Sequence, residues 1–187
     1  MARIAGSTAE ITQQRILDAA RELFAERGYA GTSIRDIAER LSMTKAALYY
    51  HFPGKRDVLA ALVEPWLNEI DELAEWAEAQ DHVDREEALR RMIDHLAAPN
   101  PTFGILISDP SAMHDSATRL NVRPRLSRLE RAFAGSDADR LAVRCALGAV
   151  RSGILGTLLE RKGNGAFADR ELEAVLRAGL AAWNAAS

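Results

Sequence analysis

The sequence predicts an all-α protein, and three observations favour that class. Apolar residues recur at the spacing of a helix face through most of the 187 residues. The periodic segments are bounded by the caps, glycines and prolines that start and stop helices. The apolar segment 102–108 fits a strand or a helix by pattern alone, but no other segment offers a partner strand, so we expect a helix there as well.

The first helix is expected at residues 9–27, after a disordered arm of residues 1–8. Its inner stripe is Ile16, Ala20, Leu23 and Phe24. Gly28 ends it as a left-handed C-cap.

Residues 33–52 predict two short helices joined by a tight turn. Ser33 is a good N-cap for the first, and Asp36 completes a capping-box pattern. Thr44 can cap the second, on which only Ala47 and Leu48 are suited to face inward. The remaining positions of that helix are Lys45, Ala46, Tyr49 and Tyr50. A short helix that exposes a lysine, two tyrosines and a small residue suits a DNA major groove, although a plain helical hairpin is the competing interpretation.

Six further helices are expected along the rest of the chain, besides the one at 102–108. The first, residues 55–79, should kink or break near Glu64 because Pro65 disfavours the helical region there. The others are expected at about 81–98 after a loop, 109–119, 121–133, 137–161 and 169–185. In the helix at 137–161, Gly148, Ser152 and Gly156 share one face and would let another backbone approach closely.

Charge and cysteine content restrict the compartment and the partners. The net charge of −3 divides into +3 for residues 1–56 and −6 for the remainder, which fits a nucleic-acid contact confined to the head. Cys145 is the single cysteine, so no internal disulfide is expected, and we interpret it as a packed small residue. With neither a signal peptide nor a membrane span in the pattern, we expect a soluble cytoplasmic protein without a membrane partner.

The sequence offers little for catalysis. His82, His95 and His114 lie far apart without the spacing of metal ligands. There is neither a phosphate-binding loop nor a nucleophile elbow. We therefore expect no enzymatic activity, no metal and no cofactor.

Residues 15–59 resemble the N-terminal DNA-binding domain of the TetR family of transcriptional regulators. The resemblance rests on Ile16-Leu17, Ala19-Ala20, Leu23-Phe24, Gly28-Tyr29, Thr32, Ile37-Ala38, Leu48-Tyr49, His51-Phe52, Lys55 and Leu59. One departure lies in the turn, where the family has glycine then valine and this chain has Ser42 and Met43. Serine can adopt a positive φ at a cost, or the turn can take another shape.

The resemblance implies a helix-turn-helix head at 1–56 and a helical ligand-binding and dimerisation body at 57–187. It further implies a homodimeric repressor that leaves a palindromic double-stranded operator when a small, mostly apolar effector binds. An activator or ligand-independent regulator is the alternative, and a helical ligand carrier or enzyme with a relic helix-turn-helix is an alternative of another class. Phosphate contacts are expected from Thr32, Ser33, Tyr49, His51 and Lys55, and base contacts from Lys45, Ala46 and Tyr50, with Thr44 at the helix start.

The resemblance also places an effector pocket among the middle helices and a dimer contact on the last two. The candidate pocket residues are Trp66, Leu73, Met92, His95, Leu96, Phe103, Met113, Leu126, Arg144 and Leu147. The candidate dimer residues are Gly148, Ser152, Gly156, Leu176 and Leu180. For the pocket, ordinary core packing is the competing interpretation, and for the small residues it is packing within one chain.

Overall fold

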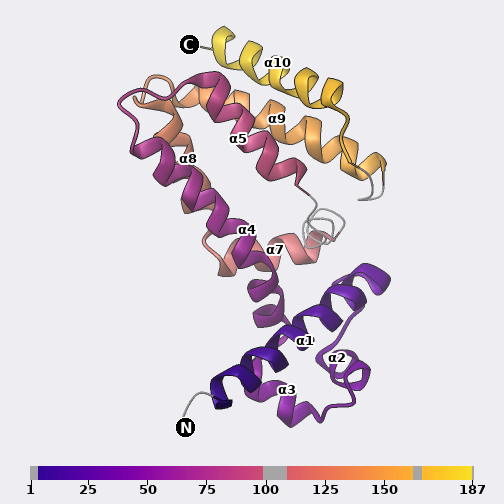
Figure 1. Ribbon diagram of the computed structural model, residues 1–187. Coiled ribbons are helices and arrows are strands. Elements are labelled where there is room, and N and C mark those ends of the chain that lie inside the picture. Colours follow the sequence, from indigo (N-terminus) through magenta and orange to yellow (C-terminus); the bar gives the residue numbers. More distant parts are fainter. Residues whose placement is uncertain (1–3, 99–108, 162–165, 187) are drawn as a thin grey trace. The chain divides into compact units, whose positions relative to one another are not determined.

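The computed structural model describes residues 4–98, 109–161 and 166–186, which form helices and no strand within those ranges (Figure 1). The helices are α1 (Ile4–Arg27), α2 (Ile34–Arg40), α3 (Lys45–His51), α4 (Lys55–Glu78), α5 (Arg85–Ala97), α7 (Pro110–Arg119), α8 (Val122–Ala134), α9 (Arg140–Glu160) and α10 (Asp169–Ala185). The predicted all-α class is confirmed. The helix expected at 102–108 lies outside the described residues.

The helices belong to two compact units. The first comprises residues 1–65 and 101–120, and the second comprises residues 66–100 and 121–187. The division between the units falls within α4 at Pro65, whereas the sequence placed the domain boundary at residue 56. The first unit also includes α7, a helix that the sequence assigned to the body.

α4 continues through Pro65, so of the two predicted outcomes near Glu64, a kink or a break, the break does not occur. Proline removes one hydrogen bond from a helix and crowds the preceding turn. The neighbouring turns are well packed, since Val63 and Leu67 are 1% and 0% exposed, respectively. Packing on both sides of the proline therefore outweighs the local preference to stop.

α1 begins at Ile4, five residues before the predicted start, so most of the expected disordered arm is helical. The predicted inner stripe is confirmed, because Ile16, Leu23 and Phe24 are at most 2% exposed. Gly28 has a φ of 75°, as expected for a left-handed residue that ends a helix.

The core of the second unit is built by α5, α9 and α10, which pack on one another, with α8 against α9. The predicted inner face of α5 is confirmed, with Leu89, Met92 and Leu96 buried. α10 comes close because it has glycine at 179, where an added Cβ would lie 2.9 Å from Val150 Cγ2 and 3.0 Å from Leu89 Cδ1.

The opposite side of α9 is not covered by any of the described residues at its two glycines, Gly148 and Gly156. An added Cβ at Gly148 or Gly156 would meet no described atom within 4 Å. Ser152 is exposed, and Leu141 and Leu159 continue this face at 62% and 52% exposed. Among the described residues, no segment packs on this face as the interpretation of packing within one chain requires. We call it the open face of α9.

Two predictions about the same helices need correction. Leu176, a candidate dimer residue, is 3% exposed and belongs to the core of the unit, whereas Leu180 is half-buried. Cys145, expected to be packed, is exposed. α9 is also long and apolar enough to cross a membrane, a test that core helices of soluble proteins pass as well.

Candidate DNA interface and effector site

The turn between α2 and α3 is a Schellman-type helix end. The amide of Met43 donates to the carbonyl of Ala38 at 2.9 Å, and the amide of Ser42 donates to Glu39 at 3.1 Å. Ser42 has a φ of 53°, in the left-handed region that favours glycine. The sequence left two possibilities, a serine with a positive φ or a turn of another shape. The structure has the first, because Ser42 adopts the positive φ that glycine would favour at this position.

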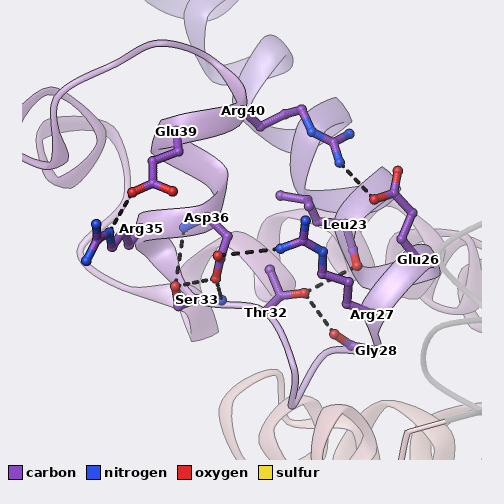
Figure 2. Close-up of polar contacts among 10 residues, drawn as sticks. All are labelled: Leu23, Glu26, Arg27, Gly28, Thr32, Ser33, Arg35, Asp36, Glu39 and Arg40. Carbon is purple, nitrogen blue, oxygen red and sulfur yellow. Dashed lines mark hydrogen bonds and ion pairs between the residues drawn. The ribbon is translucent and has the colours of Figure 1, made fainter.

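The start of α2 carries the predicted capping box (Figure 2). The amide of Asp36 donates to Ser33 Oγ at 3.2 Å, and the amide of Ser33 donates to Asp36 Oδ2 at 2.8 Å. The hydroxyl of Ser33 also donates to that carboxylate. Arg27 lies 3.6 Å from the same carboxylate, so the group that starts α2 also ties it to α1.

Thr32 is a structural residue here, and its expected phosphate contact needs correction. It is 2% exposed, and its hydroxyl lies 2.9 Å from the carbonyl of Gly28 (Figure 2). Its amide donates to the carbonyl of Tyr29 at 3.2 Å. Both of its donors are therefore used inside the unit. Ser33, next to it, is exposed.

α3 presents the surface that the sequence predicted. Leu48 is fully buried, whereas Lys45 and Ala46 are exposed and Tyr49 and Tyr50 are 50% and 85% exposed. Tyr50 therefore does not pack on Phe52, which was the competing interpretation for it. Its ring meets His51 edge-to-face at 5.2 Å, and His51 is half-buried.

Thr44 holds the start of α3, since the amide of Ala47 donates to its hydroxyl oxygen at 3.1 Å. The hydroxyl proton of Thr44 remains available to a phosphate oxygen, because this oxygen acts as the acceptor of the cap. Thr44 is exposed.

The cations of α2 are engaged with carboxylates of the same unit. Arg35 lies 2.6 Å from Glu39, and Arg40 lies 2.8 Å from Glu26 (Figure 2). Lys45 differs, because it has no ion-pair or hydrogen-bond partner among the described residues. It is thus the cation of this surface that can meet a new anion without breaking an existing pair.

Lys55, a predicted phosphate contact, is held inside the unit. Its ammonium donates to the carbonyl of Tyr29 at 2.8 Å and lies 4.2 Å from the centre of the Tyr29 ring. Burial lowers the pKa of Lys55, and the carboxylates of Asp109 and Asp115 oppose that shift. The carboxylates come from α7 and its N-terminal flank, a long way along the chain, so no local pattern announces them.

Among the effector candidates, Leu73, Met92, His95 and Leu96 are all at most 9% exposed. A shallow groove of about 240 Å³ opens beside them between α4 and α5. It brings together two of the predicted residues, Leu73 and His95. Its other lining residues, which the sequence did not single out, are Glu69, Glu72, Trp76 and Arg91.

His95 is the buried polar group of this region. Its Nδ1 lies 2.6 Å from Glu69 Oε2, and Trp66 stacks on its ring at 4.9 Å. Burial lowers the pKa of His95 below its ordinary value, and Glu69 opposes the shift. Its Nε2 is buried with no hydrogen-bond partner among the described atoms.

The remaining pocket candidates are not brought together. Arg144, expected as a polar anchor, is exposed and pairs with Glu130 at 2.9 Å, so that expectation needs correction. Leu126 and Leu147 are half-buried. Phe103 and the side chain of Met113 lie outside the described residues.

No cluster of three or more metal-ligating side chains occurs in the described ranges. The histidines that the sequence set aside illustrate this, since His82 and His114 are exposed at separate places and His95 is buried beside Glu69.

Comparison with known proteins identifies the head. Residues 16–62 match the family model described as bacterial regulatory proteins, tetR family. The head is therefore a TetR-type DNA-binding domain. It is 34% identical over 93 residues to the HTH-type transcriptional regulator TtgR of Pseudomonas putida, an alignment that covers 50% of this chain and 44% of TtgR. The chain thus aligns with less than half of this curated relative.

Solved structures extend the likeness to the fold of the whole chain. AmtR of Mycobacterium smegmatis is 25% identical with a TM-score of 0.65, and the match covers 90% of this chain and 84% of AmtR. SmeT, solved as a complex with triclosan, is 25% identical with a TM-score of 0.63, covering 94% of this chain and 90% of SmeT. The chain therefore has the all-helical TetR fold, and its relatives are transcriptional regulators.

Proposed function

We propose that this protein is a dimeric transcriptional repressor that binds a two-fold symmetric DNA operator through α3. The observation that carries the proposal is the exposed surface of α3, where Lys45, Tyr49 and Tyr50 project from a helix fixed by a family-type turn. Such a helix has the dimensions and the donors that a major groove accepts.

The contacts divide by chemistry. Lys45, Ala46 and Tyr50 face base edges, while Tyr49, His51 and the hydroxyl of Thr44 hold the sugar-phosphate backbone. Ser33 adds a phosphate contact once its hydroxyl leaves the Asp36 carboxylate. Lys55 adds a phosphate contact once its ammonium leaves the Tyr29 carbonyl. Backbone contacts set the register and the salt dependence, and base contacts set the sequence.

Dimerisation uses the open face of α9, with Gly148, Ser152 and Gly156 at its centre. Small residues allow two helices to approach closely, and Leu141 and Leu159 supply apolar area at the ends of the face. Leu180, half-buried on α10, lies at the margin. A symmetric dimer presents two copies of α3, which explains the need for a palindromic operator.

The effector is a small, mostly apolar molecule that enters beside Leu73, Met92, His95 and Leu96. SmeT, which has the same fold, was solved as a complex with the small molecule triclosan. The effector must bind the DNA-free form more tightly, since equal affinity for both forms would shift nothing. The protein needs no catalytic group, metal or cofactor for this task, and it acts in the cytoplasm on DNA.

Selection of bound DNA from a random-sequence pool with the purified protein tests the proposal. The expected result is enrichment of a two-fold symmetric sequence whose half-sites lie about one helical turn, roughly 10 base pairs, apart. If no sequence were enriched, the proposed function as a DNA-binding regulator would be contradicted, and the alternative of a ligand carrier or enzyme would be favoured. A thermal-shift screen of apolar compounds then identifies stabilisers, and those that release the selected DNA are effectors.

The regulatory direction is tested with a reporter gene placed behind the selected sequence. Repression predicts lower expression when the protein is present and recovery when an effector is added. Higher expression in the presence of the protein would identify an activator.

A further inference from the structure

Two carboxylates of the first unit join α7 to the DNA-binding helices. Asp109 Oδ2 accepts a hydrogen bond of 2.8 Å from the amide of Ala30, in the turn after α1. Its Oδ1 accepts one of 3.0 Å from the amide of Ser111, at the start of α7. One carboxylate thus serves both segments, and α7 cannot move away without giving up a charge-assisted hydrogen bond.

Asp115, further along α7, is shared in the same way. Its Oδ2 accepts a hydrogen bond of 2.8 Å from the hydroxyl of Tyr29, and its Oδ1 lies 3.0 Å from Arg56 Nη2. The side chain of Asp115 is 15% exposed, and that of Arg56 is 67% exposed. A largely buried acid therefore holds a guanidinium that is otherwise open to solvent.

Both acids are charged at neutral pH. Burial alone would raise the pKa of Asp109, but hydrogen bonds from Ser111, Ala30 and Ala112 outweigh it and lower the pKa to about 2. Burial would also raise the pKa of Asp115. The hydrogen bonds from the Tyr29 hydroxyl and Arg56 outweigh it, so the pKa of Asp115 also lies below its ordinary value.

The cations that these acids face lie in the first turn of α4, directly after α3. Arg56 is paired with Asp115, and Lys55, held at Tyr29, feels the charge of both acids. The resemblance to the TetR family places Lys55 at a DNA phosphate. The carboxylates of Asp109 and Asp115 and the phosphates of DNA are therefore alternative anionic partners for the same two cations, Arg56 and Lys55.

We propose that Asp109 and Asp115 form an acidic latch that competes with DNA phosphates for Arg56 and Lys55. The inference rests on the proposed function, because it presupposes DNA binding by this unit. With the latch closed, Arg56 is paired with Asp115 and Lys55 is held at the Tyr29 carbonyl within the field of both acids, so DNA binding is weak. When α7 releases them, each adds a phosphate contact, so any event that holds α7 in place lowers DNA affinity.

The test is a double-mutant cycle between Asp115→Asn and Arg56→Gln in the full chain, read by fluorescence anisotropy on the selected DNA over a salt series. In Asp115→Asn, the side-chain amide oxygen can still accept the hydrogen bond from the Tyr29 hydroxyl, but the side chain no longer carries the charge that holds Arg56. Asp81→Asn is the control, since it changes the net charge equally and lies in an exposed loop of the other unit.

The latch predicts that Asp115→Asn binds DNA about 3- to 10-fold more tightly at moderate salt, because a released phosphate contact carries a steep salt dependence. The same change should have a much smaller effect when Arg56 is already Gln, because only the weaker influence of Asp115 on Lys55 is left, and Asp81→Asn should match the wild type. Equal tightening in both backgrounds, unchanged affinity or weaker binding by Asp115→Asn would overturn the latch.

Arg56→Gln alone gives a second reading if Asp115→Asn fails to fold. The latch predicts a salt slope smaller by about one unit, since one phosphate contact is lost. An unchanged slope would mean that Arg56 stays on Asp115 in the complex and would contradict the latch. If the wild type binds no DNA, the proposed function fails together with the latch, whereas wild-type binding with no effect of either variant removes the latch alone.

Discussion

The DNA-binding helices and the second unit are held together by different forces. In the first unit, α2 and α3 are only seven residues long each and are fixed by caps, a left-handed turn and hydrogen bonds such as those of Thr32. In the second unit, long helices pack through apolar side chains, and glycine permits close approach at position 179. Substitutions should therefore act locally on geometry in the first unit and on packing in the second.

The largest effect is expected from Gly179→Leu in the second unit. The new side chain would collide with Val150 and Leu89, which lie 2.9 and 3.0 Å from an added Cβ. Overpacking of this kind costs about 3 kcal/mol of unfolding free energy. Urea denaturation measures it, and a variant as stable as the wild type would show that α10 does not need this close approach.

Gly148→Leu is the matched control on the open face of α9. It meets no described atom within the chain, so the fold should keep its stability or gain about 1 kcal/mol from helix propensity. The side chain should instead prevent association of two copies. Analytical ultracentrifugation is expected to show a dimer for the wild type and a monomer for Gly148→Leu. A wild-type protein that is monomeric at micromolar concentration would contradict the proposed dimer.

Thr32→Val in the first unit should cost about 1–2 kcal/mol of stability, because the carbonyl of Gly28 loses its buried hydroxyl donor. The DNA sequence preference should stay unchanged, since Thr32 is 2% exposed. Thermal denaturation measures the first effect and selection of bound DNA the second. A variant of normal stability with weaker, less salt-dependent DNA binding would restore Thr32 as a phosphate contact.

A smaller, pH-dependent effect is expected from His95. Burial lowers its pKa in the folded state, so the unfolded chain binds the additional proton below the ordinary pKa of about 6.5. Its contribution is present above that pH and is lost on acidification. His95→Leu should flatten the decline in unfolding free energy between about pH 7.5 and 5.5, and an equally steep decline in the variant would assign it to other groups.

The smallest effect is expected at the turn between α2 and α3. Ser42→Gly removes the cost of a left-handed serine, which outweighs the added flexibility of glycine in the unfolded chain. The expected gain is about 0.5–1 kcal/mol, or a rise of about 1–4 °C in Tm. A lower Tm would indicate that the serine hydroxyl makes a contact worth more than the strain.

The same contrast explains what the sequence could predict. The caps at Ser33 and Thr44 and the burial of Leu48 follow from residues within one helical turn, and the structure has all of them. The Thr32 hydrogen bonds, the continuity of α4 through Pro65 and the pairing of Arg144 with Glu130 depend on packing against other segments. Local patterns contain no signal for these.

Contacts between distant segments were the least accessible to sequence reasoning. Asp109 and Asp115 meet Ala30 and Tyr29 across 79 and 86 positions of the chain. The glycine spacing in α9 predicts a face for close approach of another helix. Only the fold distinguishes Gly148, where an added Cβ meets no described atom within 4 Å, from Gly153, where it would lie 2.9 Å from Val175.

The most direct test of DNA reading by α3 compares Lys45→Ala with Lys55→Ala in selection of bound DNA. Lys45→Ala should relax the preference at one base pair by about 1–3 kcal/mol. Lys55→Ala should weaken binding evenly across sequences and reduce the salt slope by about one unit. If Lys55→Ala changed the preferred sequence while Lys45→Ala left it unaltered, the assignment of base contacts to α3 would be contradicted.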